Sequence, residues 1–143
     1  MLSTSSKYAL KAVLYLADQS NEDHKVMVKD LSKATQVPKA YLAKLLQTLS
    51  RHNIVSSAKG PKGGYFLTSE NKMLPLYSVV EIIDGASKFE MCILGLEQCS
   101  EKKPCALHQY ISPSRELFIS TLKKMTIHEL SLDLKKSSSF LPL

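Results

Sequence analysis

The stretch VPKAYLAKLLQTLSRHNIVSSAKGPKGGYFL, residues 37 to 67, decides the fold, because its periodicity changes once along its length. In its first part, apolar residues recur three to four positions apart, which predicts an amphipathic helix with Pro38 in the first turn. Its second part places glycines and prolines between two short apolar runs, IVSS and YFLT. This pattern predicts a β-hairpin with a basic tip.

Two further helices are predicted before this stretch. SSKYALKAVLYLAD has apolar residues at helical spacing, and Ser3 to Ser6 offer side-chain oxygens to cap its start. KDLSKATQV then places Leu31 and Ala34 three residues apart. The order of helix, helix, tight turn, helix and basic hairpin is typical of a winged helix-turn-helix, here within residues 1–72.

The second half of the chain is predicted to be helical on both sides of a loop. LPLYSVVEIIDG predicts a linking helix within residues 73–91 that stops at Gly85. Neither helical nor strand periodicity holds through residues 92–108, which are expected to form a loop. The fold class is therefore mostly α with a small β-hairpin wing, a winged helix-turn-helix domain followed by a long helix.

That long helix is predicted from SPSRELFISTLKKM, within the region 109–132. Ser112 would be its N-cap and Pro113 its first residue, so that it spans about residues 112 to 125. Thr126 and Glu129 form a capping-box pattern that begins a new helical turn. The polar tail, residues 133–143, is predicted to be disordered.

The net charge of +6 is confined to the N-terminal half. Residues 1 to 72 contain eleven Lys and Arg against five Asp and Glu, whereas the remaining residues contain eight of each sign. A field of one sign on one half attracts polyanions, with nucleic acid the first candidate and an anionic membrane surface the second; a solvated basic face without a partner is the third interpretation.

Six residues are candidates for DNA contact, because they lie at the start of the third helix or at the hairpin tip. A helix N-terminus favours phosphate, and glycines at the tip allow close approach to a minor groove. Tyr41 has a second interpretation as a packing aromatic, and the lysines as ordinary surface residues. The candidates are Lys39, Ala40, Tyr41, Lys44, Lys59 and Lys62.

All three cysteines fall within the stretch CILGLEQCSEKKPCALH, residues 92 to 108. Six residues separate Cys92 from Cys99, five separate Cys99 from Cys105, and two separate Cys105 from His108. Thiolates are ligands for iron-sulfur clusters and for zinc, and a loop allows them to converge. The open alternatives are an iron-sulfur cluster, a closed zinc site with one imidazole ligand, and a reversible thiol switch without metal.

The element order, the GPKGGYFL hairpin and the three-cysteine loop before a helix ending in KKMTIHEL resemble the IscR/NsrR-type (Rrf-type) family of winged-helix transcription regulators, over roughly residues 1 to 132. The resemblance implies a homodimer, joined through the long helix, that binds a pseudo-palindromic operator in double-stranded DNA. It also implies that the loop holds an iron-sulfur cluster, with 2Fe-2S favoured over 4Fe-4S, and senses cluster status, redox state or nitric oxide.

The fourth cluster ligand is expected to be His108. Some members of the resembled family use a histidine two residues beyond the third cysteine, and others use an acidic or histidine side chain on the first helix of the partner. Where that acid would lie, this chain has Lys7, a poor ligand when protonated. His108 also has a simpler interpretation as a helix-entry histidine that faces water.

Other classes of function fit the sequence less well. No Gly-rich nucleotide loop follows a strand, and no Ser/His/Asp order of a catalytic triad is present. The enzyme alternative is therefore limited to a small metal-dependent redox protein. Within the same fold, the alternative is a metal-free thiol-switch or small-ligand regulator. No apolar run reaches about 18 residues, and the N-terminus lacks a basic leader and a cleavage site. A cytoplasmic protein without a membrane partner is expected.

Overall fold

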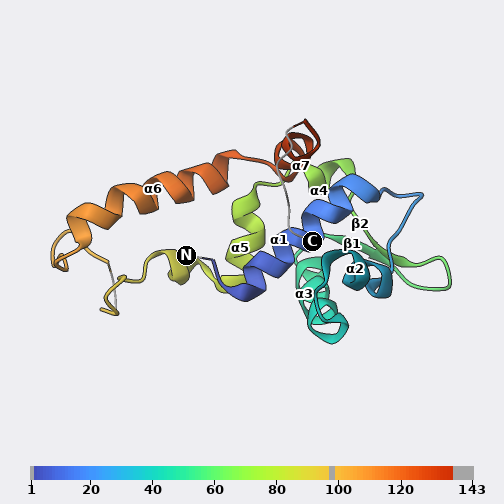
Figure 1. Cartoon of the computed structure of the whole chain (residues 1–143), viewed down its shortest axis with the longest axis horizontal. Coiled ribbons are helices and arrows are strands. Elements are labelled where there is room, and N and C mark those ends of the chain that lie inside the picture. The colour runs from blue at the N-terminus through green and yellow to red at the C-terminus, as the bar shows by residue number, and fades with distance from the viewer. Residues whose placement is uncertain (1, 97–98, 137–143) are drawn as a thin grey trace.

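The computed structural model describes residues 2–96 and 99–136. In Figure 1, one helix extends like an arm from a body that holds the other helices and the hairpin. The mostly helical winged-helix fold with one two-stranded hairpin is confirmed. In chain order the elements are α1 (Thr4–Gln19), α2 (Val28–Thr35), α3 (Lys39–Arg51), β1 (Ser56–Ala58), β2 (Gly64–Phe66), α4 (Ser69–Lys72), α5 (Leu76–Asp84), the 3₁₀ helix η1 (Ala86–Phe89), α6 (His108–Lys124) and α7 (Ile127–Lys136).

Helix α1 is the centre of the body, because it packs against α2, α3, α5 and α7. Its start is capped as predicted, since the Ser3 side chain accepts a hydrogen bond from the Ser6 N–H at 3.0 Å. The apolar faces of the surrounding helices meet α1 in one continuous core. Its most deeply buried side chains include Val13, Leu16, Leu31, Leu42, Leu46, Leu49, Leu67, Val79, Val80 and Ile127.

A tight turn joins α2 to α3 and sets the start of the third helix. Gln36 adopts the left-handed conformation (φ 55°), and Val37 is buried behind it. The Ser32 hydroxyl donates a hydrogen bond to the Val37 carbonyl at 2.6 Å. Pro38 occupies the cap position, one residue before the helix that it was predicted to begin.

The wing is an antiparallel hairpin in which Ser57 pairs with Tyr65. A third segment joins it, because Val26 and Tyr65 exchange backbone hydrogen bonds of 2.9 and 2.8 Å. This bridge fixes the hairpin to the segment that leads into α2. The wing and the helix-turn-helix are therefore held as one unit.

Helix α6 begins earlier than the sequence predicted. It starts at His108, so Ser112 is not its N-cap and Pro113 lies inside the helix. The Ser112 hydroxyl donates to the Glu116 carboxylate at 3.2 Å instead of capping a helix end. The stretch between α5 and α6 also contains η1, which was predicted as part of the linking segment without a helix of its own.

The C-terminal end of α6 is anchored to the body. The Leu76 N–H donates to the Met125 carbonyl and the Ile127 N–H to the Leu74 carbonyl, both at 3.0 Å. The predicted capping box starts α7, with the Thr126 N–H donating to the Glu129 carboxylate at 2.8 Å and the Glu129 N–H to the Thr126 hydroxyl at 3.1 Å.

Helix α7 folds back onto α1. An ion pair joins Lys135 to Asp18, and the hydrogen bond from Lys135 holds the pKa of that carboxyl below its ordinary value. Because α7 continues to Lys136, residues 133–136 are helical rather than part of a disordered tail, and residues 137–143 lie outside the described part. None of the described helices is long and apolar enough to span a membrane.

Candidate functional site

The outer face of α3 is polar because its apolar face is fully used in the core. Leu42, Leu46 and Leu49 are buried against the body, which leaves Lys39, Ala40 and Lys44 exposed at the N-terminal half of the helix. The helix N-terminus adds partial positive charge and unpaired backbone N–H groups there. This end of α3 is therefore suited to contact a phosphate backbone.

Tyr41 lies on the same end of α3 but is held by α1. Its hydroxyl forms a hydrogen bond with the Ser5 hydroxyl, and its ring meets that of Tyr8 edge to face at a centroid distance of 5.8 Å. The side chain is 40% exposed. Tyr41 is therefore a packing aromatic, as the second interpretation had it, and part of its side chain is also exposed at the surface.

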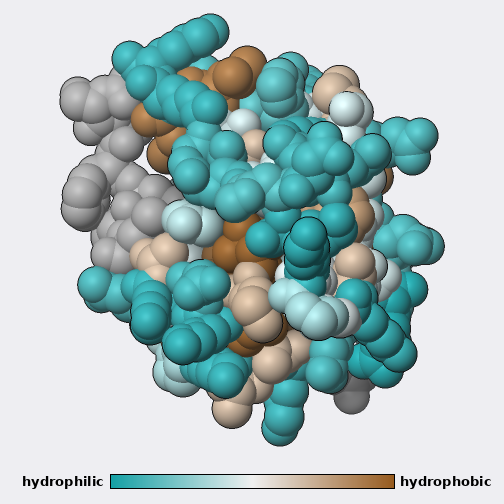
Figure 2. Space-filling model, turned by 90° about the vertical axis from the view of Figure 1, so that its right-hand side faces the viewer, coloured by the Kyte–Doolittle hydropathy of each residue, from teal (hydrophilic) through white to brown (hydrophobic). Residues whose placement is uncertain are grey.

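The wing places its two candidate lysines at an exposed tip. Lys59 and Lys62 are exposed on either side of the turn between β1 and β2. Figure 2 views the molecule from the side on which the hairpin lies, and hydrophilic side chains cover most of that face. Within residues 2–96 and 99–136, no carboxylate lies within ion-pair distance of Lys39, Lys44, Lys59 or Lys62. Their charge is therefore available to an external anion.

Lys44→Ala and Lys59→Ala are each expected to weaken DNA binding and to lower the slope of log Kd against log salt concentration by about one, since each removes about one phosphate contact. The measurement is a salt series of fluorescence anisotropy titrations with duplex DNA. Lys124→Ala is the control, because that lysine is exposed on the last turn of α6. If neither variant changed the slope while the control did, the DNA surface would lie elsewhere.

The loop between η1 and α6 brings the four candidate metal ligands together as two pairs. The sulfur of Cys99 lies 3.1 Å from Nδ1 of His108, the first residue of α6. Cys92 lies close enough to Cys105 for that thiol to lower its pKa. In the described ranges no three His, Cys, Asp or Glu side chains converge into a metal-binding group. The sequence spacing predicted four ligands without indicating which of them are neighbours, and the structure arranges them as two pairs.

Backbone hydrogen bonds fix both pairs within the loop. The Cys99 N–H donates to the Glu90 carbonyl at 2.9 Å, which ties the middle of the loop back to the residue after η1. The His108 N–H donates to the Cys105 carbonyl at 3.0 Å and closes the turn that leads into α6. Because that turn starts the helix, the His108 ring is aimed toward the loop rather than toward water.

The Cys92 thiol is the most chemically distinct of the three. It is buried, whereas Cys99 and Cys105 are half-buried. The Leu94 N–H hydrogen bond lowers the pKa of Cys92 most, and the Cys105 thiol, the Leu96 N–H and the positive charge of Arg115 lower it further against the opposing effect of burial. This environment favours the thiolate, the form that binds metals.

The donor set fits an iron-sulfur cluster in its chemistry. Three thiols and one imidazole are soft and borderline ligands, the kind such clusters use. They occupy one loop and the first turn of one helix. The four side chains are of the right type for a cluster and lie in the same region, but among the described residues no three of them converge on one point.

The start of α1 contacts both the end of α5 and the DNA-facing helix α3. Both the N–H and the hydroxyl of Ser3 donate to the carboxylate of Asp84, the last residue of α5. Two residues further along α1, Ser5 contacts Tyr41 of α3. The start of α1 thus joins α3 to the helix that precedes η1 and the cysteine loop.

Sequence reasoning missed Asp84, Ser5 and Arg115. Asp84 was visible only as the residue before the Gly85 stop, and Ser5 only as one of several capping serines. Arg115 lies close enough to Cys92 for its charge to lower the pKa of that thiol. The two residues are joined through the loop between η1 and α6, whose path has no period from which such a contact could be predicted.

Comparisons with known proteins find similar chains among transcriptional regulators. The family model described as "Rrf2: Iron-dependent Transcriptional regulator" matches residues 2–133. An HTH-type transcriptional regulator of Aquifex aeolicus is 34% identical over 132 residues, 91% of this chain and 90% of its own. The HTH-type transcriptional regulator IscR of Yersinia pseudotuberculosis is 29% identical over 129 residues, 90% of this chain and 77% of its own. The solved structure of CymR, the global cysteine regulator of B. subtilis, superposes with a TM-score of 0.73 at 22% identity, covering 93% of this chain and 97% of that one.

Proposed function

The chain belongs to the Rrf2 family of transcriptional regulators, and from this premise we propose that it binds operator DNA as a homodimer and reports the state of an iron-sulfur cluster held by its cysteine loop. Its relatives are regulators and not enzymes, so the enzyme alternative is set aside. The observation that carries the proposal is the pairing of Cys99 with His108 and of Cys92 with Cys105 beside a basic winged domain.

DNA contact is proposed through the exposed end of α3 and the wing. Lys39, Ala40 and Lys44 would face the major groove or its phosphates, and Lys59 and Lys62 would lie along the neighbouring minor groove. Tyr41 would contact DNA with its exposed edge while its hydroxyl stays on α1. Exposure and the absence of ion pairing within the described residues support these roles.

The cluster would be held by Cys92, Cys99, Cys105 and His108, with a 2Fe-2S cluster favoured. A bound cluster would supply a group whose integrity and charge depend on iron, sulfide and redox conditions. The donor chemistry and the family's iron dependence support an iron-sulfur cluster at this loop. In the loop itself, the residues hold the donors, exclude water from Cys92 and orient the His108 ring from the first turn of α6.

The state of the loop would reach the DNA through α1. Movement of the segment after Asp84 changes the support of Ser3, and the same helical turn holds Tyr41 through Ser5. Two arrangements of this contact, with different DNA affinities, are sufficient for regulation.

One observation favours a second candidate function, a metal-free thiol switch. Cys92 and Cys105 lie close enough in the loop for the Cys105 thiol to lower the pKa of Cys92. Oxidation by a peroxide would join their sulfurs in a disulfide, with both thiol protons and two electrons reducing the peroxide to water or an alcohol. This switch would use one pair of the loop and leave Cys99 and His108 free.

Anaerobic purification tests the proposal against this alternative. A coloured protein with iron and acid-labile sulfide in comparable amounts, and a DNA affinity that changes when the cluster is removed, is the expected result. Colourless protein carrying zinc, or an affinity that changes only with peroxide, would contradict the cluster. An affinity indifferent to both treatments would remove the sensing role.

The homodimer is proposed through an exposed apolar stripe on α6. Tyr110 is 68% and Leu117 69% exposed, seven residues apart on one helix face, with Leu107 one turn before them. Exposed apolar side chains aligned on one helix are typical of a helix-helix interface.

Leu117→Asp is expected to convert the homodimer to a monomer, because it replaces the most exposed apolar side chain of this stripe with a charge. Light scattering coupled to size-exclusion chromatography measures the change, and Glu116→Ala, an exposed neighbour on the same helix, is the control that should stay dimeric. A Leu117→Asp protein that remained dimeric would show that α6 does not join the subunits by this face.

A further inference from the structure

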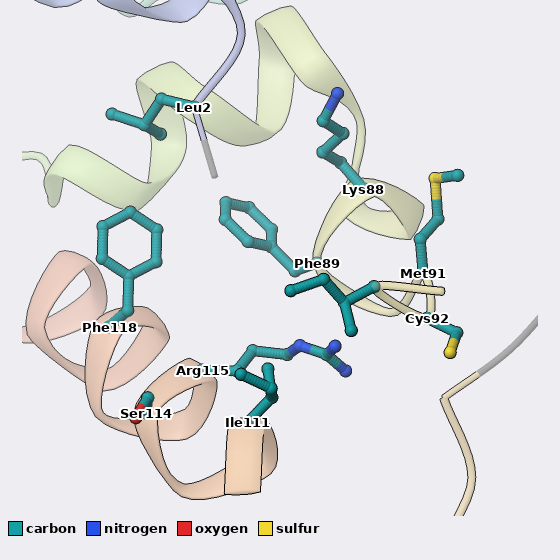
Figure 3. Close-up of a pocket in the computed structure, with 10 residues that line it drawn as sticks. Leu2, Lys88, Phe89, Met91, Cys92, Ile111, Ser114, Arg115 and Phe118 are labelled. Carbon is teal, nitrogen blue, oxygen red and sulfur yellow. The ribbon is translucent and has the colours of Figure 1, made fainter. Parts of the chain in front are cut away.

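A pocket of about 420 Å³ lies between α6, η1 and the N-terminal segment. Figure 3 shows the Phe89 and Phe118 rings and Leu2 around its apolar part. The volume is within the range of small-molecule sites. Its lining residues are Leu2, Lys88, Phe89, Met91, Cys92, Ile93, Ile111, Ser114, Arg115 and Phe118.

The pocket combines apolar walls with positive charge and no acid. Lys88 and Arg115 are among the lining residues, and none of the lining residues is Asp or Glu. In Figure 3 the Arg115 side chain extends from α6 between Phe89 and Ile111 toward the Cys92 side. Arg115 is half-buried and, over residues 2–96 and 99–136, has no carboxylate within ion-pair distance. A partly desolvated guanidinium that has no carboxylate partner among the described residues is a strong site for an anion.

The two features select one chemical class of ligand. A guanidinium fork binds a planar carboxylate through two parallel hydrogen bonds, and the aromatic and aliphatic wall behind it favours an apolar tail. A phosphate is a poorer ligand, because it is strongly hydrated and has no apolar part to pack against the wall. A second copy of the chain is a poorer occupant, because the exposed stripe of Tyr110 and Leu117 is turned about 100° around α6 from Ile111 and Phe118.

We propose that this pocket binds a small monocarboxylate with an apolar tail, its carboxylate on Arg115 and its tail against Phe89 and Phe118. The site goes beyond the proposed sensing function, which needs no small-molecule ligand. Because Cys92 forms part of the wall, a bound ligand lies directly against the cysteine loop. Occupancy of the pocket is thus in contact with the segment proposed to hold the cluster.

The experiment compares octanoate with octanol, which share the tail and differ in the charged group. Each is titrated calorimetrically into the full chain, both as isolated anaerobically and after removal of metal. Octanoate is expected to bind at least about tenfold more tightly than octanol, the contribution of a charged hydrogen-bonded pair. Equal affinity, or no binding of octanoate at millimolar concentration in either preparation, would overturn the proposal.

Variants assign the binding to the pocket. Arg115→Gln is expected to reduce octanoate affinity to the level of octanol, and Arg115→Lys to retain part of the difference, whereas Lys124→Gln, an exposed control at the far end of α6, should bind as the unchanged protein does. Nuclear Overhauser contacts from the octanoate tail to the Phe118 ring, lost in Phe118→Leu while those to Phe89 remain, give a readout independent of charge. Unchanged octanoate binding in Arg115→Gln would place the ligand elsewhere.

Discussion

Cys99→Ala is expected to yield a colourless protein that retains little iron or sulfide after anaerobic purification, while its circular dichroism stays that of the unchanged fold. Cys99 is the cysteine paired with His108, at 3.1 Å, and it lies half-buried in a loop that contributes little to the core. Removal of the thiol leaves two cysteines and one imidazole, too few protein ligands for a stable cluster. Even loss of a residue that only supports a metal ligand costs about 10- to 100-fold in affinity, so loss of a ligand should cost more.

Two variants make this result specific. Ser100→Ala changes the next residue of the same loop, whose hydroxyl accepts a hydrogen bond from the Lys102 N–H, and should leave the iron content unchanged. His108→Ala should give a protein that loses its cluster faster in air, since a weaker ligand would replace the imidazole. If Cys99→Ala kept iron and sulfide in the amounts of the unchanged protein, the ligand set would not include this cysteine.

Gly64→Ala is expected to detach the wing and to lower the free energy of unfolding by about 3 kcal/mol, from backbone strain together with a steric clash. Gly64 has a φ of +138°, which L side chains rarely adopt. A Cβ at this position would lie 2.6 Å from the Val26 carbonyl oxygen and 2.8 Å from its carbon, both backbone atoms of the segment that pairs with Tyr65. Neither can move without breaking that bridge.

A substitution at Gly60, in the turn between β1 and β2, distinguishes the effect of backbone strain from that of steric clash. It also has a positive φ, +102°, but an added Cβ would meet no heavy atom within 4 Å. Gly60→Ala should therefore cost only about 1 kcal/mol, from strain alone. Urea unfolding measures both variants, and DNA titration should show the larger loss for Gly64→Ala. Equal destabilisation of the two would mean that the wing does not depend on contact with Val26.

Local patterns were sufficient to predict most of the fold. The stripe of α3, the glycine-marked hairpin, the Gly85 stop of α5 and the Thr126 capping box each rest on interactions between residues close in sequence, and all are confirmed. The predicted start of α6 was wrong because it rested on the preference of proline for a first helical position, whereas the helix begins at His108 and continues through Pro113 despite the backbone hydrogen bond that proline cannot donate. The capping box of α4, formed by Thr68 and Asn71, was missed because the helix is a single turn.

The candidate site divides in the same way. Residue types and clustering indicated Cys92, Cys99, Cys105 and His108, but which of them pair depends on the path of the loop, which has no period to extrapolate. Exposure of the lysines followed from helix and hairpin geometry. The contacts of Ser3 with Asp84 and of Ser5 with Tyr41 join residues 81 and 36 positions apart, and such contacts follow only from the packed fold.

The anchoring of α6 at one end makes it a lever. Its last turn is held by Leu122 in the core and by Lys123 over the Tyr77 ring at 4.8 Å, whereas its first turn carries His108 and the cysteine loop away from the body (Figure 1). A helix of this length spans about 25 Å, so a rotation of about 5° at the anchor displaces the far end by about 2 Å. That displacement is enough to break a hydrogen bond. Because the cysteine loop lies at the far end of α6, a movement of the thiols under the proposed function would accompany a much smaller rotation of this helix at its anchor on the body.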